Sequence, residues 1–105
     1  MATLQQLVKR YFNRKRRRFQ RSIDVVFAPG HFNAGYFGGA KLVSDGTGAP
    51  AQVVTLGPAH QGKRIDVEFT AKRDPGDTIS IGDTTLINEG DTATLQLNGT
   101  TWEAL

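Results

Sequence analysis

The chain of 105 residues contains no cysteine. It therefore forms no disulfide bond, offers no thiolate to a metal ion and has no thiol nucleophile, while its redox compartment stays undetermined. Long apolar runs are missing too, because no stretch approaches the roughly eighteen consecutive apolar residues of a membrane-spanning helix. No apolar stretch with a small-residue cleavage site follows the basic N-terminus, so we expect no secretory signal and a chain that remains in the cytoplasm where it is made.

The sequence also lacks the residue patterns of familiar catalytic sites. The two histidines, His31 and His60, each stand alone in a loop rich in glycine or proline, without a second metal ligand at helical or strand spacing. It has no nucleophile elbow, no phosphate loop ending in Lys-Ser/Thr and no dinucleotide-binding glycine pattern. We therefore predict that the protein is not an enzyme and has no cofactor and no bound metal.

The tripeptide Gly-Asp-Thr occurs three times in residues 76–92. The spacings of six and eight residues are too short and unequal for a solenoid repeat. A local explanation is sufficient, because glycine supplies the turn, aspartate bonds its own backbone and threonine begins the next strand. The alternative is a Ca²⁺ site formed by Asp77, Asp83 and Asp91, although no loop has EF-hand spacing.

Acidic residues are absent from residues 1–22, which hold eight basic residues and therefore carry +8. Residues 23–105 hold five basic and ten acidic residues, which gives −5. This asymmetry indicates a basic arm attached to a mildly acidic body. A body this small buries only about 60 to 65% of the surface of its unfolded chain, so we expect it to gain stability from oligomerisation.

The arm shows the pattern of an amphipathic helix. Thr3 and Gln6 have the spacing of a capping box, and five apolar residues follow at the 3.6-residue period of one helix face. These residues are Leu4, Leu7, Val8, Tyr11 and Phe12. The basic residues are Lys9, Arg10, Arg14, Lys15, Arg16, Arg17, Arg18 and Arg21. We predict a helix from about residue 4 to about residue 20, apolar on one side at first and charged all round from residue 13 onward.

Four interpretations of this arm stay open at this point. It is a nucleic-acid arm whose affinity falls steeply with salt, although no base-reading motif accompanies it. It is a membrane-surface helix, although its apolar stripe covers only about two turns. It is a strap that places its apolar face in a partner's groove and its arginines on acidic protein or enclosed nucleic acid. Alternatively, it is a solvated helix that covers its own β domain.

The sequence of residues 23–39 predicts a short extended run followed by a linker. The run spans residues 23–28, and "PGHFNAGYFGG" at residues 29–39 is rich in chain breakers. Three aromatic residues, Phe32, Tyr36 and Phe37, make this an unusual tether. We interpret them either as plugs for pockets on a neighbouring subunit or as a cover for the domain's own core.

From residue 40 onward the period changes to two. Apolar and polar residues alternate in "KLV", "QVVTL", "RIDVEFT", "TISI", "TLI", "ATLQLN" and "TWEAL", with turn signals between them. Asn98-Gly99 is the strongest turn signal and predicts a type I′ hairpin. The pattern predicts a mainly β domain at residues 40–105, a small antiparallel sandwich or barrel-like fold, preceded by the arm at residues 1–22 and the linker at residues 23–39.

The C-terminal half resembles the small β modules of tailed-phage virion proteins, which occur in tail fibres, spikes and capsid decoration or cement subunits. The resembling stretch is "VVTLGPAHQGKRIDVEFTAKRDPGDTISIGDTTLINEGDTATLQLNGTTWEAL", residues 53–105. Its features are the alternating strand through Ile65, Val67 and Phe69, the "TISI" strand, the strand after "EGDT" and the closing "NGTTW". The resemblance implies a structural and commonly trimeric module without an active site.

These observations lead to a structural virion protein as the first hypothesis. The short body and basic arm fit a capsid decoration or cement subunit that trimerises and anchors its arm on the major capsid protein or other virion proteins. The alternatives are a tail, neck, baseplate or fibre-associated subunit and a nucleic-acid-binding protein. We expect the virion as its location, with the host cytoplasm during assembly, non-specific contact with nucleic acid and no membrane. Trp102, Tyr36 and Phe37 also prompt a carbohydrate-binding module, although Trp102 has the position of a core residue.

Overall fold

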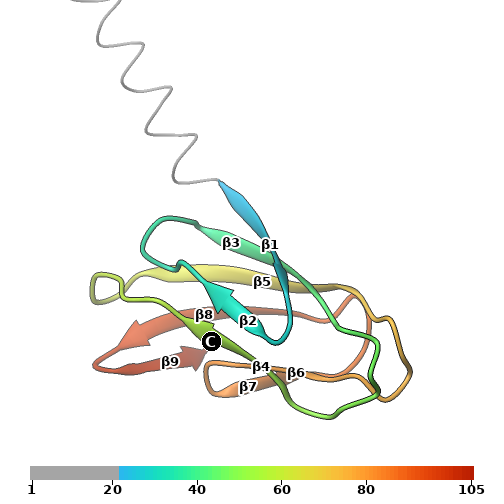
Figure 1. Ribbon diagram of the computed structural model, residues 1–105. Helices are drawn as coiled ribbons and strands as arrows, with labels where there is room; N and C mark the ends of the chain where they lie inside the picture. Colours follow the sequence, from blue (N-terminus) through green and yellow to red (C-terminus); the bar gives the residue numbers. More distant parts are fainter. Residues whose placement is uncertain (1–21) are drawn as a thin grey trace, which may run out of the picture.

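Residues 22–105 are described by a computed structural model, and they form a body made of β-strands (Figure 1). The strands are β1 Ile23–Phe27, β2 Gly30–Phe32, β3 Gly39–Val43, β4 Gln52–Leu56, β5 Arg64–Ala71, β6 Ile79–Ile81, β7 Thr84–Leu86, β8 Thr92–Asn98 and β9 Thr101–Ala104. No helix occurs among these described residues, so the prediction of a mainly β fold is confirmed. The predicted arm helix lies outside the described residues.

The strands form two mixed sheets, one of five strands in the order β1-β3-β5-β8-β9 and one of four in the order β2-β4-β6-β7. The first six strands alternate between the sheets, and their pairings β1–β3, β3–β5, β2–β4 and β4–β6 are parallel. The chain therefore winds as a flattened coil (Figure 1). The predicted antiparallel arrangement is wrong for these strands, because a chain that changes sheet after each strand returns to the first sheet in its original direction.

Antiparallel pairing is confined to the later strands, where tight hairpins reverse the chain. β6 pairs with β7, and β8 pairs with both β5 and β9. Asn98 pairs with Thr101, so the turn predicted at Asn98-Gly99 is shifted by one residue to Gly99-Thr100. Gly99 has φ 66° at the first central position, which is the type II′ pattern and not the predicted type I′.

The core lies between the two sheets and takes residues from both. Val26, Leu42 and Phe69 are in register across β1, β3 and β5, and all three are buried. Strict alternation along β5 sends Ile65 and Val67 to the same inner face as Phe69. The four-stranded sheet supplies buried residues of its own, namely Phe32, Val54, Ile79, Ile81 and Leu86.

The body begins earlier in the chain than predicted. Residues 23–39 were predicted to be an extended segment and a linker, but β1 and β2 are already strands of the two sheets. Between them the chain turns from one sheet to the other at the cis peptide Ala28-Pro29 and at Gly30. A Cβ atom at Gly30 would lie 2.4 Å from the carbonyl oxygen of Phe27, so only glycine fits this corner. The β body therefore begins at Ile23 and not at residue 40.

Candidate functional site

The predicted partner-binding residues of the arm lie outside the described residues. This applies to the five apolar residues between Leu4 and Phe12 and to the eight basic residues between Lys9 and Arg21. The first described residue, Ser22, is tied to the body because its carbonyl oxygen accepts a hydrogen bond from the backbone N–H of Gly38 at 3.0 Å. The basic segment therefore runs directly into β1.

The three aromatic residues of the predicted linker have different environments. Phe32 is fully buried in the core, so it covers the protein's own interior and is not an interface plug. Phe37 is partly buried against the same core, with its ring centroid 6.0 Å from that of Phe32. Tyr36 is 52% exposed and stacks edge-on against Phe37 at 4.9 Å. Tyr36 is therefore the most exposed of the three.

Trp102 is a core residue. It is buried, and it belongs to the same hydrophobic cluster as its pairing partner Leu97. Its carbonyl oxygen accepts the backbone N–H of Asp83 at 3.0 Å, which fastens the β6–β7 turn to β9. A sugar-stacking ring has to present one face to solvent, so the buried position argues against a carbohydrate-binding role for Trp102.

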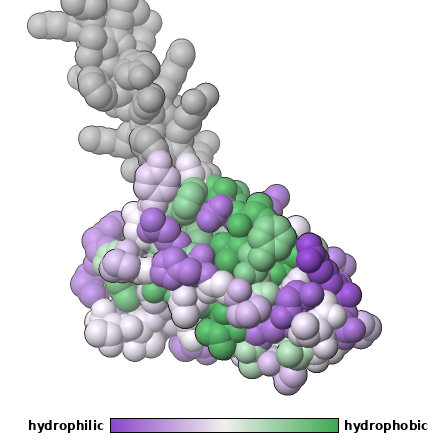
Figure 2. All heavy atoms as spheres, in the orientation of Figure 1, coloured by the Kyte–Doolittle hydropathy of each residue, from purple (hydrophilic) through white to green (hydrophobic). Residues whose placement is uncertain are grey.

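The strongest candidate surface begins at β1. Ile23, Val25 and Phe27 are 58%, 51% and 60% exposed, and they share the outward face of the strand, while Val26 points into the core. β1 is also the end strand of its sheet, so among the described residues no strand pairs with its outer edge. Figure 2 shows hydrophobic surface gathered over this strand. An apolar edge strand of this kind is an interaction surface unless something covers it.

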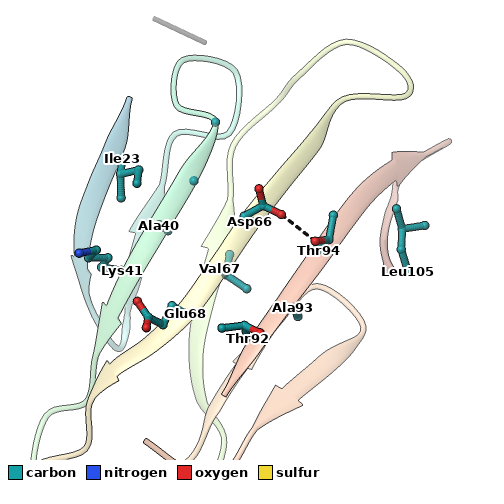
Figure 3. Close-up of a pocket in the computed structure, with 12 residues that line it drawn as sticks. Ile23, Ala40, Lys41, Asp66, Val67, Glu68, Thr92, Ala93, Thr94 and Leu105 are labelled. Atoms are coloured by element: carbon teal, nitrogen blue, oxygen red, sulfur yellow. Dashed lines mark hydrogen bonds between the residues drawn. The ribbon is translucent and has the colours of Figure 1, made fainter. Parts of the chain in front are cut away.

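A groove of about 790 Å³ continues from β1 across the outer face of the five-stranded sheet (Figure 3). Pairing places Ile23, Gly39, Asp66 and Thr94 in one row across four strands. Gly39 has no side chain, so the row is hollow between Ile23 and Asp66. A Cβ atom at Gly39 would lie 3.0 Å from the carbonyl oxygen of Asp66, so a residue with a side chain would be crowded at this position.

The groove combines apolar ends with an acidic centre. Asp66 accepts a hydrogen bond of 2.6 Å from the hydroxyl of Thr94, which fixes its carboxylate on the sheet surface. Glu68 lies opposite Lys41 in the next row, on the same face. The groove lining therefore carries two carboxylates and one ammonium group, between exposed Ile23 at one end and exposed Leu105 at the other (Figure 3). Such a surface suits a partner that is both basic and apolar.

A second polar arrangement lies around Asp77, whose side chain is fully buried. Its carboxylate accepts hydrogen bonds from the backbone N–H groups of Gly46 at 2.9 Å and Gly48 at 2.7 Å, and from Nε2 of Gln52 at 2.8 Å. Burial acts to raise the pKa of Asp77, but the bonds from Ser44, Gly48, Gly46 and Gln52 outweigh it, so the pKa is lowered. Asp77 is a structural anchor for the loop between β3 and β4.

The other two aspartates of the Gly-Asp-Thr triplets also bind backbone. Asp91 accepts the N–H groups of Ile87 and Asn88, which lowers its pKa, and Asp83 accepts the N–H of Ala104 at 2.7 Å. The predicted local role is therefore right for Asp91, whereas Asp77 and Asp83 fasten segments that are distant in the sequence. Within residues 22–105 no three acidic, histidine or cysteine side chains group as metal ligands.

The two histidines differ from each other. His31 belongs to β2 rather than to a loop, and its Nδ1 lies 3.1 Å from the hydroxyl of Thr55 on the neighbouring strand. His60 is exposed in the segment between β4 and β5. The described part of the chain contains no helix long and apolar enough to cross a membrane.

Comparisons of the chain with protein-family models, with curated proteins and with solved structures found no match.

Proposed function

We propose that this protein is a structural subunit that fastens itself to a larger assembly through its basic arm and the outer face of its five-stranded sheet. The observation that carries the proposal is the exposed apolar stripe of Ile23, Val25 and Phe27, which follows the basic segment directly in the chain. Two kinds of attachment, electrostatic and apolar, are thus placed side by side. Exposed apolar side chains gathered on one edge strand are typical of an interaction surface, which supports the proposal of a partner here.

The sequence resemblance of residues 53–105 gives the assembly its proposed identity, a tailed-phage virion. Within it, a capsid decoration or cement subunit that forms homotrimers fits a small body with a basic arm, and the major capsid protein is its proposed partner. A tail, neck or baseplate position uses the same surfaces. Mass spectrometry of separated heads and tails, prepared from the phage whose genome encodes the chain, distinguishes these positions.

The direct test is co-sedimentation of the full-length protein with purified shells of that phage. We expect saturable binding at a fixed ratio to the shell protein. An arm variant with Arg17→Glu and Arg18→Glu removes two basic contacts and should bind at least tenfold more weakly. The matched control reverses two charges of the body outside the strands and outside the groove, Lys63→Glu and Lys72→Glu, and should bind as the wild type does. Folded protein that does not sediment with shells contradicts the proposal.

Nucleic-acid binding is the second candidate, and the +8 charge of residues 1–22 favours it. A protein that contacts six or more phosphates loses affinity for duplex DNA with a slope of roughly −5 in a plot of log K against log salt. Fluorescence anisotropy with a labelled duplex at several salt concentrations measures this slope. A flat response removes the candidate, whereas a steep slope together with failure to bind shells makes it the better one.

A further inference from the structure

The groove on the outer face of the five-stranded sheet has an occupant that the chain itself can supply. We propose that it receives the basic N-terminal segment, residues 4–21, of a second copy of this protein. The inference rests on the proposed function in one respect. The second copy is a neighbouring subunit of the same assembly, and the groove on that subunit is the docking site of the arm. The proposal concerns the contact between copies and not the contact with the shell.

Chemical complementarity is the first argument. The groove places the carboxylates of Asp66 and Glu68 between exposed apolar side chains, of which Ile23 and Leu105 are 58% and 67% exposed. A complementary segment needs basic and apolar side chains within a few residues of each other. Residues 4–21 combine eight basic with six apolar or aromatic residues and contain no acid, whereas acids outnumber bases by ten to five in residues 23–105. The arm is therefore the part of this chain that matches the groove.

The position of residue 22 argues for a second copy rather than for the chain's own arm. The Gly38 N–H bond to the carbonyl of Ser22 continues the β1–β3 pairing, so Ser22 extends the line of β1 by one residue. To cover its own groove, the arm would have to reverse direction just before Ser22. Residues 1–28 contain neither glycine nor proline, the strongest chain breakers. An arm from a neighbour reaches the groove without a tight turn.

Lys41 provides the sharpest prediction, because it is a positive charge inside a groove that we assign to a basic segment. It stands directly opposite Glu68 in the pairing of β3 and β5, and it is exposed. Lys41→Glu should therefore strengthen self-association, by about tenfold at low salt, whereas Glu68→Lys should weaken it by about the same factor. A gain of affinity is informative because damage to the fold does not produce it.

Sedimentation equilibrium of the full-length protein measures these changes. The control is Glu89→Lys, a matched reversal at an exposed position outside the groove, and it should associate as the wild type does. Circular dichroism verifies that each variant keeps the β fold. A wild-type protein that stays monomeric up to millimolar concentration contradicts the proposal, and so does a Lys41→Glu variant that associates no more tightly than wild type.

A mixing experiment identifies which copy supplies the arm. The arm variant Arg17→Glu, Arg18→Glu keeps an intact groove, and Glu68→Lys keeps an intact arm. Each should associate weakly alone, while their mixture should associate about tenfold more tightly, because the intact arm of one docks on the intact groove of the other. No gain on mixing means that the arm covers its own groove or another protein, and the inference is then wrong. Shell binding that survives this failure leaves the proposed function standing.

Discussion

Strands β1 and β5 belong to the same sheet but have different outward faces. β5 alternates strictly, with Ile65, Val67 and Phe69 inward and with Asp66 and Glu68 among its outward residues. β1 buries Val26 but also exposes Ile23, Val25 and Phe27, so it is apolar on both sides. The outward face of β5 is polar, as expected of a strand with one face in the core. The outward face of β1 instead exposes three apolar side chains. This additional exposed apolar surface is the basis of the proposed contact.

The largest effect is expected on the inward face of β5. Phe69 is fully buried, so Phe69→Ala removes a core ring and leaves a cavity. We expect the free energy of unfolding to fall by about 3 to 5 kcal/mol, measured by urea denaturation of the full-length protein. A loss below about 1 kcal/mol would show that the inner face of β5 packs loosely, and the contrast with β1 would then disappear.

The buried carboxylate of Asp77 should make the stability of the fold depend on pH. The lowered pKa of Asp77 stabilises the fold fully above the ordinary carboxyl pKa of about 3.9, and this contribution is lost as the pH falls below it. Asp77→Asn removes buried hydrogen bonds to the charged group and should lower Tm by roughly 10 °C at pH 7.

The comparison is a thermal melt series between pH 7 and pH 3. The Tm difference between wild type and Asp77→Asn should shrink toward the acid end, because the wild type then loses its charged anchor as well. Glu103→Gln, a matched change at an exposed position outside the groove, should leave Tm at pH 7 unchanged. A constant difference at every pH would mean that the charge of Asp77 does not stabilise the loop.

An outward aromatic of β1 should matter less than the inward one of β5. Phe27 is 60% exposed, and the guanidinium carbon of Arg73 lies 5.6 Å from its ring centroid. Phe27→Ala should lower the free energy of unfolding by about 0.5 to 1 kcal/mol, the usual size of an exposed cation–π contact. Urea denaturation at low protein concentration measures it. A loss as large as that of Phe69→Ala would place Phe27 in the core.

The smallest effect on folding is expected from Ile23→Thr with Val25→Thr. Threonine keeps the β-branched shape that suits a strand, and both positions face solvent, so the free energy of unfolding should change by about 0.5 kcal/mol or less. Self-association should nevertheless weaken several-fold, because Ile23 forms one apolar end of the groove and Val25 continues the same exposed face of β1. Sedimentation equilibrium measures the change in self-association, and urea denaturation measures the change in the free energy of unfolding. Unchanged association would show that the excess apolar surface of β1 has another purpose.

Most strands were predictable because alternation is a local property. The runs at residues 52–56, 64–70 and 93–98 coincide closely with β4, β5 and β8, and the extended run at residues 23–28 contains β1. β2 was missed because it is three residues long and begins with Gly30 after a proline, in a stretch that reads as a loop. The turn at Gly99 was predicted one residue too early. The residue types Asn-Gly indicate that a turn is near, but they do not fix which residues of the two strands pair.

The sequence by itself determined the mainly β composition of the body, the separation of a basic segment from an acidic one and the inward face of each long strand. These features follow from the period of apolar residues, from the charge and from the chain breakers. All three signals are local, because they depend on residues that are close together in the sequence. Tertiary structure alone decided the parallel pairing, the groove and the long-range role of Asp77. Alternation says which side chains share a face but not which strand lies alongside. Asp66, Lys41 and Ile23 are far apart in the chain and meet only after the coil is wound.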